Sequence, residues 1–247
     1  MSDPYDVNFC FPVRELQNDK VKLTPFIVSK LLRNYHTTKL FKPSLHAESW
    51  FTASRDHPEL YDWVPFGPFD AKEHWVKTVI EERIQPDPGT LLFAVFDKVK
   101  APPESSDFPL AGHIGLLNTS VENLMTEVAF VFTIPAYRKS YVTSNSIGLL
   151  LHWCLDLPAD GGLGLRRVQW QCNELNVASR RAAERMGFKF EGVERWQRSL
   201  PSGKQGPTVT RDDPKKQYPG RHTVRLALCW DGWDEARELV RKQMNRI

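Results

Sequence analysis

The stretch that decides the fold is RVQWQCNELNVASRRAAERMGFKF, residues 167–190. Residues 167–173 alternate apolar and polar side chains, and this period of two predicts a β-strand with unlike faces. Residues 176–186 then predict a short helix, and Gly187 stands where such a helix needs a left-handed C-terminal cap. Because Phe188 begins another strand pattern, the stretch predicts strand, helix and strand in direct succession.

Further strand patterns precede this stretch, and a helix pattern separates them from it. Residues 110–117 and 127–134 predict an antiparallel pair joined by a turn-like segment. After Pro135, apolar residues recur at the spacing that builds one face of a helix. The other elements predicted upstream are a first strand at 21–25, helical periodicity within 27–83 with Asp70 as a helix cap, and a buried strand at 90–96.

The chain after residue 200 changes in composition and then returns to regular patterns. Residues 201–220 are rich in proline, glycine and charge, which predicts a long exposed loop rather than a domain boundary. A last strand at 224–230 and a terminal helix at 233–244 follow. We therefore predict one α/β domain over residues 1–247, with an inserted loop at about 200–220.

Charge and composition exclude several classes of function. The 33 basic and 30 acidic residues give a net charge of +3, too even a balance for the strong field of a nonspecific nucleic-acid binder. The polar, acidic start of the chain shows neither a secretory signal nor a transit peptide, so we expect no membrane association. The cytoplasm is the expected location, with the nucleus as the open alternative.

The cysteines indicate no metal centre. Cys10, Cys154, Cys172 and Cys229 are far apart and form no CxxC pair, which is typical of reduced core thiols. A zinc site usually has paired ligands a few residues apart, so we expect no metal.

Five short motifs in order carry a family resemblance. LAGHIG at 110–115, EVAFVF at 127–132, and the series NVAS, AERMGF and EG between 176 and 192 resemble the RimJ/RimL-type branch of the GNAT superfamily, as does the aromatic segment 61–69. The resemblance implies the GNAT fold, a central mixed twisted sheet with helices on both faces. It also implies acetyl-CoA-dependent transfer of an acetyl group to a primary amine, by direct attack in a ternary complex.

The resemblance implies a place for acetyl-CoA along the fourth strand of the family fold. There the pantetheine arm pairs with backbone groups much as an added strand would, and a backbone amide holds the thioester oxygen. In this chain the implied backbone positions are Phe130, Val131 and Phe132.

One departure from the family concerns the loop that receives the CoA pyrophosphate. Family members place glycines there, whereas residues 138–143 contain none. The following helix N-terminus still offers free amides and partial positive charge. We predict that hydroxyls and basic groups replace part of the missing nest, with a capped helix and solvated basic residues as the alternative. The groups concerned are Arg138, Lys139, Ser140, Thr143 and Ser144.

Acetyl transfer requires a group that removes a proton from the amine. Glu127 is the first candidate, because it stands in an otherwise apolar strand; the alternative is an edge or outward-facing carboxylate. Glu191 and His113 are further candidates, although a strand histidine is often a satisfied buried group. His222 opens the last strand and is placed on the acceptor side.

Protonation of the departing thiolate needs a second group. Many GNAT enzymes use a tyrosine on the helix after the fifth strand, but residues 176–187 contain none. Ser179 matches the candidate of the RimJ/RimL branch. Ser179 and Asn176 alternatively bind CoA amides or cap the helix.

The acceptor side is predicted from aromatic residues and the long loop. Tyr61, Trp63, Phe66 and Phe69 supply walls with little conformational entropy to lose, or else they belong to the core. The loop at 201–220 acts in this hypothesis as a lid that orders on binding. The acceptor is a small amine or a peptide or protein N-terminus, and the protein is a monomer or homodimer. A catalytically degenerate module that binds or senses acyl-CoA is the alternative function.

Overall fold

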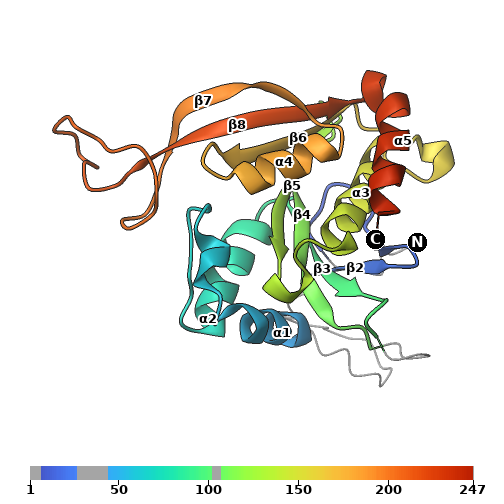
Figure 1. The fold of residues 1–247 in the computed structure, drawn as a ribbon, viewed down its shortest axis with the longest axis horizontal. Coiled ribbons are helices and arrows are strands. Elements are labelled where there is room, and N and C mark those ends of the chain that lie inside the picture. The colour runs from blue at the N-terminus through green and yellow to red at the C-terminus, as the bar shows by residue number, and fades with distance from the viewer. Residues whose placement is uncertain (1–6, 27–43, 102–106, 247) are drawn as a thin grey trace.

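The computed structural model describes residues 7–26, 44–101 and 107–246, which form one eight-stranded sheet with helices around it (Figure 1). The strand order is β1-β2-β3-β4-β5-β6-β8-β7. The strands are β1 (Leu16–Gln17), β2 (Val21–Pro25), β3 (Leu91–Asp97), β4 (Leu110–Ser120), β5 (Met125–Thr133), β6 (Arg167–Asn173), β7 (Lys189–Ser199) and β8 (Gly220–Cys229). The helices are α1 (Ser44–Ser54), α2 (Lys72–Trp75) with a π-helical continuation (Val76–Ile84), α3 (Tyr141–Leu155), α4 (Val177–Arg185) and α5 (Trp233–Met244).

The sheet is mixed, as the sequence predicts. Every neighbouring pair of strands is antiparallel except β5 and β6, which run parallel. The predicted bounds of β2, β6 and α5 agree with the structure. The short strand β1 escaped prediction because two residues are too few to show a period.

One predicted helix cap is wrong. Asp70 does not cap α2, because the N-cap position is Ala71 and no side chain bonds to the first turn. Part of the helical periodicity predicted within 27–83 falls on residues 27–43, which lie outside the described residues.

Helices cover both faces of the sheet, and β3 shows the division. Leu91, Phe93 and Val95 pack into a core formed with α3, α4 and α5, which we call the α3-side core. Leu92 and Ala94 pack into a second core formed with α1 and α2, the α1-side core. Because alternate residues of a strand point to opposite faces, the almost wholly apolar sequence of β3 is explained by burial on both sides.

Strands β5 and β6 pair over only part of their length. Their register runs from Met125 with Arg167 to Val128 with Trp170 and then ends, although both strands continue. Residues 129–133 of β5 therefore have no strand partner on the side away from β4. Such an unpaired edge leaves backbone donors and acceptors free to bind an extended ligand.

The loop between β7 and β8 is long and contains only turns and bends, as predicted. It extends with the two strands well beyond the rest of the sheet at the left of Figure 1. One side chain ties it back to the aromatic segment, since the half-buried Lys204 donates from Nζ to the carbonyl oxygen of Tyr61 at 2.7 Å.

Candidate active site

A bulge in β5 is the central backbone feature of the site. His113 lies opposite Phe132 and Gly115 opposite Ala129, so two residues of β5 face the single Ile114 of β4. Phe130 adopts φ of 52°, the left-handed region that costs a residue with a side chain roughly 1 kcal/mol. A bulge of this kind turns the backbone groups of one strand away from the ladder and re-aims them.

Two neighbours of the bulge on β4 hold it in place. A Cβ atom added to Gly112 would lie 2.1 Å from the carbonyl oxygen of Phe132, so only glycine allows this close approach. The His113 ring contacts those of Trp50 and Phe132, and its Nδ1 donates to the carbonyl oxygen of Phe130 at 2.9 Å.

His113 is held in the neutral form. The side chain is buried, and burial lowers the pKa of His113 to about 3, outweighing the hydrogen bond to Phe130 that favours the charged form. His113 therefore matches the satisfied buried histidine of the sequence analysis. It positions the bulge and is poorly suited to collect a proton.

Glu127 lies on β5, just before the bulge. It is 5% exposed on an inner strand, so the structure excludes an edge or outward-facing carboxylate. The neutral amides of Asn118 and Gln171 donate to its Oε2 at 3.0 and 2.9 Å. Both donors are neutral, and no cation in the part of the chain that the structure describes pairs directly with the carboxyl group.

Burial dominates the electrostatics of Glu127. It raises the pKa of Glu127 to about 7, although the hydrogen bond from Asn118 and the charges of Arg198, Arg221 and Arg225 act in the opposite direction. A carboxylate that titrates near neutral pH suits a general base, since proton transfer is most effective when the pKa lies near the operating pH.

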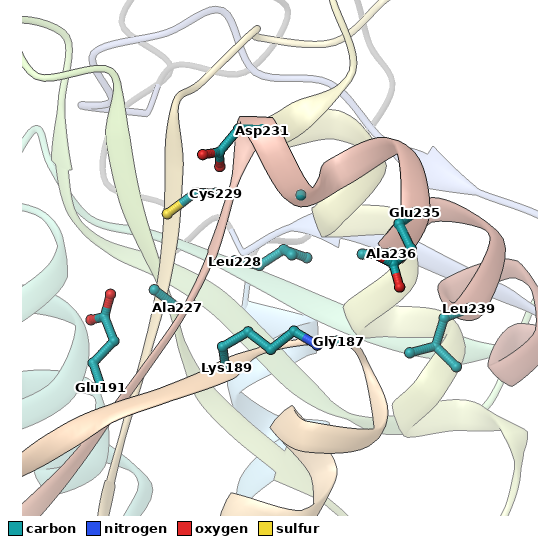
Figure 2. A pocket seen from close by; sticks show the side chains of 11 residues that line it. Gly187, Lys189, Glu191, Ala227, Leu228, Cys229, Asp231, Glu235, Ala236 and Leu239 are labelled. Carbon is teal, nitrogen blue, oxygen red and sulfur yellow. The ribbon is translucent and has the colours of Figure 1, made fainter.

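Glu191 is a less suitable base. Arg167 pairs with its carboxylate, with Nη1 at 2.8 Å from Oε1, and this hydrogen bond lowers the pKa of Glu191. Glu191 instead lines a hollow of about 300 Å³ between the end of β8 and α5, shown in Figure 2. Other residues lining it include Lys189, Cys229, Asp231 and Glu235.

His222 is fixed by the edge strand. Its Nδ1 accepts a hydrogen bond from the backbone N–H of Trp196 at 3.0 Å, and the two rings meet edge to face. Trp196 also lines a hollow of about 460 Å³ with residues of the long loop, among them Thr208 and Arg211. The loop thus encloses space next to the end of the sheet where His222 stands.

The helix N-terminus predicted to receive the pyrophosphate begins at Ser140. Ser140 is the N-cap of α3, accepting from the N–H of Val142 at 3.3 Å and donating to the carbonyl oxygen of Tyr137 at 2.6 Å. Lys139 adopts φ of 58°, so the left-handed conformation that glycine serves in the family is present without glycine.

Of the other groups predicted around this helix N-terminus, some are held by hydrogen bonds and others are exposed at the surface. The Thr143 hydroxyl bonds to that of Thr133 at 2.9 Å, and Arg138 Nε donates to the Thr133 carbonyl oxygen at 3.4 Å. Lys139 is exposed and Ser144 partly exposed on the first turn of α3. Capping therefore accounts for Ser140, while the two basic side chains stay at the surface.

Asn176 and Ser179 lie at the start of α4. Asn176 is the N-cap and accepts from the backbone N–H of Ser179 at 3.0 Å, as the capping interpretation expects. The Ser179 hydroxyl oxygen accepts from Trp170 Nε1 at 3.0 Å. Since the indole is the donor, the Ser179 hydroxyl keeps its proton for donation, and the Cys172 thiol lies within hydrogen-bond reach of it.

The aromatic segment belongs largely to the α1-side core. Tyr61 and Phe69 are buried there and contact each other at a ring-centroid distance of 5.5 Å. Phe66 is half-buried and stacks on Phe132 at 6.4 Å, while Trp63 is also half-buried. Phe66 and Trp63 thus retain surface for a substrate, and the buried rings of Tyr61 and Phe69 both contact Phe66.

Comparison with known families decides the classification. A family model described as an acetyltransferase (GNAT) domain matches residues 39–189, more than half of the chain. The chain belongs to the GNAT acetyltransferase family. The predicted family, fold and enzyme class are thereby confirmed. Comparison with curated proteins found no sequence match.

Solved structures share this GNAT fold at low identity. A GCN5-related N-acetyltransferase from Brucella melitensis has a TM-score of 0.69 and 21% identity, over 94% of this chain and 85% of that chain. RimJ from Mycobacterium smegmatis, solved in complex with CoA-disulfide, has a TM-score of 0.61 and 15% identity, over 90% and 88%. A GNAT-family acetyltransferase from Bacillus anthracis has a TM-score of 0.58 and 14% identity, over 88% and 99%.

Other features of this GNAT chain concern metals, thiols and membranes. The described residues bring together no group of three or more His, Cys, Asp or Glu suited to a metal ion. Cys154 and Cys172 are buried and Cys10 and Cys229 are partly buried, all as free thiols. Within the described ranges, no helix has the length and apolar character needed to cross a membrane.

Sequence reasoning missed several polar residues around Glu127. Asn118 lies in the segment interpreted only as a turn, and Gln171 was assigned only to the polar face of β6. Arg221 is 8% exposed at the start of β8 and gave no signal, because an arginine after an exposed loop looks like a surface charge. The alternation along β6 was the one pattern that pointed toward this polar face.

Proposed function

We propose that the protein is an acetyl-CoA-dependent N-acetyltransferase that acetylates a primary amine of a small molecule, a peptide or a protein N-terminus in a ternary complex. The observation that supports it most is the buried Glu127, with a pKa near 7, three residues before the Phe130 bulge on the same strand. A base and a re-aimed backbone are what amide formation requires from the protein.

The chain offers matching positions for acetyl-CoA. The unpaired edge of β5 from 129 to 133 fits an extended pantetheine arm. The N-terminus of α3, with the exposed Arg138 and Lys139 before it, fits the pyrophosphate. Bound there, acetyl-CoA supplies an activated acetyl group as a thioester, whose carbon–sulfur bond is exchanged for the carbon–nitrogen bond of the product amide.

The side chains divide the proton transfers between them. Glu127 receives a proton from the amine, directly or through a water molecule, and the amides of Asn118 and Gln171 steady the carboxylate while it is charged. Backbone N–H groups near the bulge stabilise the negative charge that develops on oxygen. Ser179, oriented by Trp170, donates a hydrogen bond to the departing sulfur and passes it a proton while taking one from water, so that the hydroxyl is restored. Glu127 releases the amine proton to solvent.

A thiol-release assay with acetyl-CoA and a panel of primary amines tests the proposal. We expect free CoA together with an acceptor whose mass increases by one acetyl group. Tight binding of CoA by calorimetry without turnover of any amine would favour the degenerate sensor module instead. Absence of CoA binding would remove both functions.

A further inference from the structure

Arg221 is a buried cation for which the described residues supply no ion-pair partner. The residue is 8% exposed, and its Nε is inaccessible to solvent and makes no hydrogen bond. The Arg221 side chain makes no ion pair with any residue that the structure describes. Burial lowers the pKa of Arg221, and the neighbouring Arg198 lowers it further. An uncompensated buried charge is costly, so such a group usually meets an anion when the protein works.

The nearby charges do not provide that anion. Arg198 lies directly opposite Arg221 in the β7–β8 ladder, an arrangement of like charges that is unfavourable. Glu194 is already paired with Arg225 at 2.8 Å. Glu127 is close enough for its charge to raise the pKa of Arg221, but Asn118 and Gln171 hold its carboxyl group.

A second unsatisfied donor lies beside Arg221. The Nδ2 of Asn173 is buried and has no hydrogen-bond partner, while its Oδ1 accepts from the N–H of Leu175. Asn173 lies opposite Thr223, two residues along β8 from Arg221, so both side chains emerge on one face of the sheet. Two buried donors that meet no acceptor among the described residues indicate a place for an oxyanion.

Glu127 emerges on this same face. Its register partner is Gln169 of β6, and Gln169, Gln171 and Asn173 alternate along one side of that strand. Four residues of β6 separate the level of Glu127 from that of Asn173, which is about 13 Å along the strand. The side chains shorten this backbone separation, because the Gln171 side chain reaches the Glu127 carboxyl and the Glu127 charge acts on Arg221. An amine at Glu127 and an anion at Arg221 and Asn173 therefore fit one acceptor molecule.

We propose that Arg221 and Asn173 bind a carboxylate of the acceptor, and that the enzyme acetylates amines that carry one. The planar fork of a guanidinium matches a carboxylate, and the carboxamide N–H₂ adds a further donor. This inference rests on the proposed function, since it names the class of acceptor for the same site.

Matched acceptors test the proposal. Triglycine spans about 10 Å when extended and carries a carboxylate, and triglycinamide has the same length without the charge. We expect the wild-type kcat/KM to favour triglycine by about tenfold or more. In Arg221→Met the ratio of kcat/KM for triglycine to that for triglycinamide should fall to about one. The ratio is the readout because the lost charge also acts on Glu127 and so changes the rate with both acceptors alike. Arg180→Met, on the exposed face of α4, serves as the control and keeps the preference.

The melting temperature distinguishes a role of Arg221 in acceptor recognition from a purely structural role. Removing an unpaired buried charge should raise the melting temperature of Arg221→Met by at least about 2 °C, with Arg180→Met near the wild-type value. A lowered melting temperature with equal loss for both acceptors would overturn the proposal. So would a wild-type enzyme that turns over both acceptors equally.

Failure of catalysis is distinguishable from failure of this inference. If no amine is acetylated, the proposed function fails, and calorimetry of triglycine against the CoA-saturated protein decides the inference alone. Binding to the wild type that is weakened about tenfold in Arg221→Met supports the carboxylate site. Absence of binding to the wild type overturns it.

Discussion

Glu127 and Glu191 are both glutamates of the same sheet, and their surroundings shift their pKa values in opposite directions. Glu127, 5% exposed on β5, receives hydrogen bonds from neutral amides, and burial raises its pKa to about 7. The Glu191 side chain, 41% exposed on the edge strand β7, is paired with Arg167, which lowers its pKa. Burial without a directly paired cation makes a proton acceptor, whereas an exposed ion pair makes a permanently charged group.

Replacing each carboxylate by its isosteric amide gives the largest expected contrast. Glu127→Gln should lower kcat/KM for acetyl transfer by about 10²–10³-fold, because the amine proton loses its acceptor. Glu191→Gln should stay within about twofold of the wild type. Steady-state thiol release measures both, and calorimetry with CoA confirms that the cofactor site is intact. Equal losses in the two variants would break the comparison.

The pH dependence of the free energy of unfolding gives a second contrast between Glu127 and Glu191, with a smaller expected effect. The folded-state pKa of Glu127 lies near 7, above the ordinary value of 4.5, so its contribution to stability is present at low pH and is lost as pH rises through 7. This loss is on the order of 3 kcal/mol. Glu127→Gln should abolish it, so that the variant gains stability over the wild type at pH 8 but not at pH 5.

The matched exposed residue should behave differently. Glu191→Gln should cost less than about 1 kcal/mol, because the partly exposed ion pair is screened by solvent. Urea unfolding at several pH values measures the free energy of unfolding of both variants. A wild-type stability that does not fall between pH 5 and pH 8 relative to Glu127→Gln would contradict the buried, protonatable carboxyl.

The sequence predicted the elements and the first catalytic candidate for identifiable reasons. β6 and α5 were predictable because their apolar periods are regular, and Glu127 stood out as a charge in an apolar strand. The buried state of His113 was also a stated alternative. The local sequence pattern was sufficient to predict a feature where one residue differed in polarity from its immediate neighbours.

Features that depend on pairing register were out of reach. Arg221 and Asn173 come together only through the register of β6 and β8, which no local pattern encodes. The aromatic segment was ambiguous because buried and exposed aromatic residues share the same composition, and only packing places Tyr61 in the core. The left-handed Lys139 was hidden because glycine is the usual signal of that conformation.

The ionisation of Glu127 is the most direct test of the account. We predict that kcat/KM of the wild-type enzyme, calculated on the concentration of neutral acceptor amine at each pH, rises as a group with a pKa of about 7 loses its proton. Glu191→Gln should keep this profile, and the residual activity of Glu127→Gln should lack it. A profile governed by a pKa near the ordinary 4.5 of glutamate, or one that persists in Glu127→Gln, would contradict the central claim.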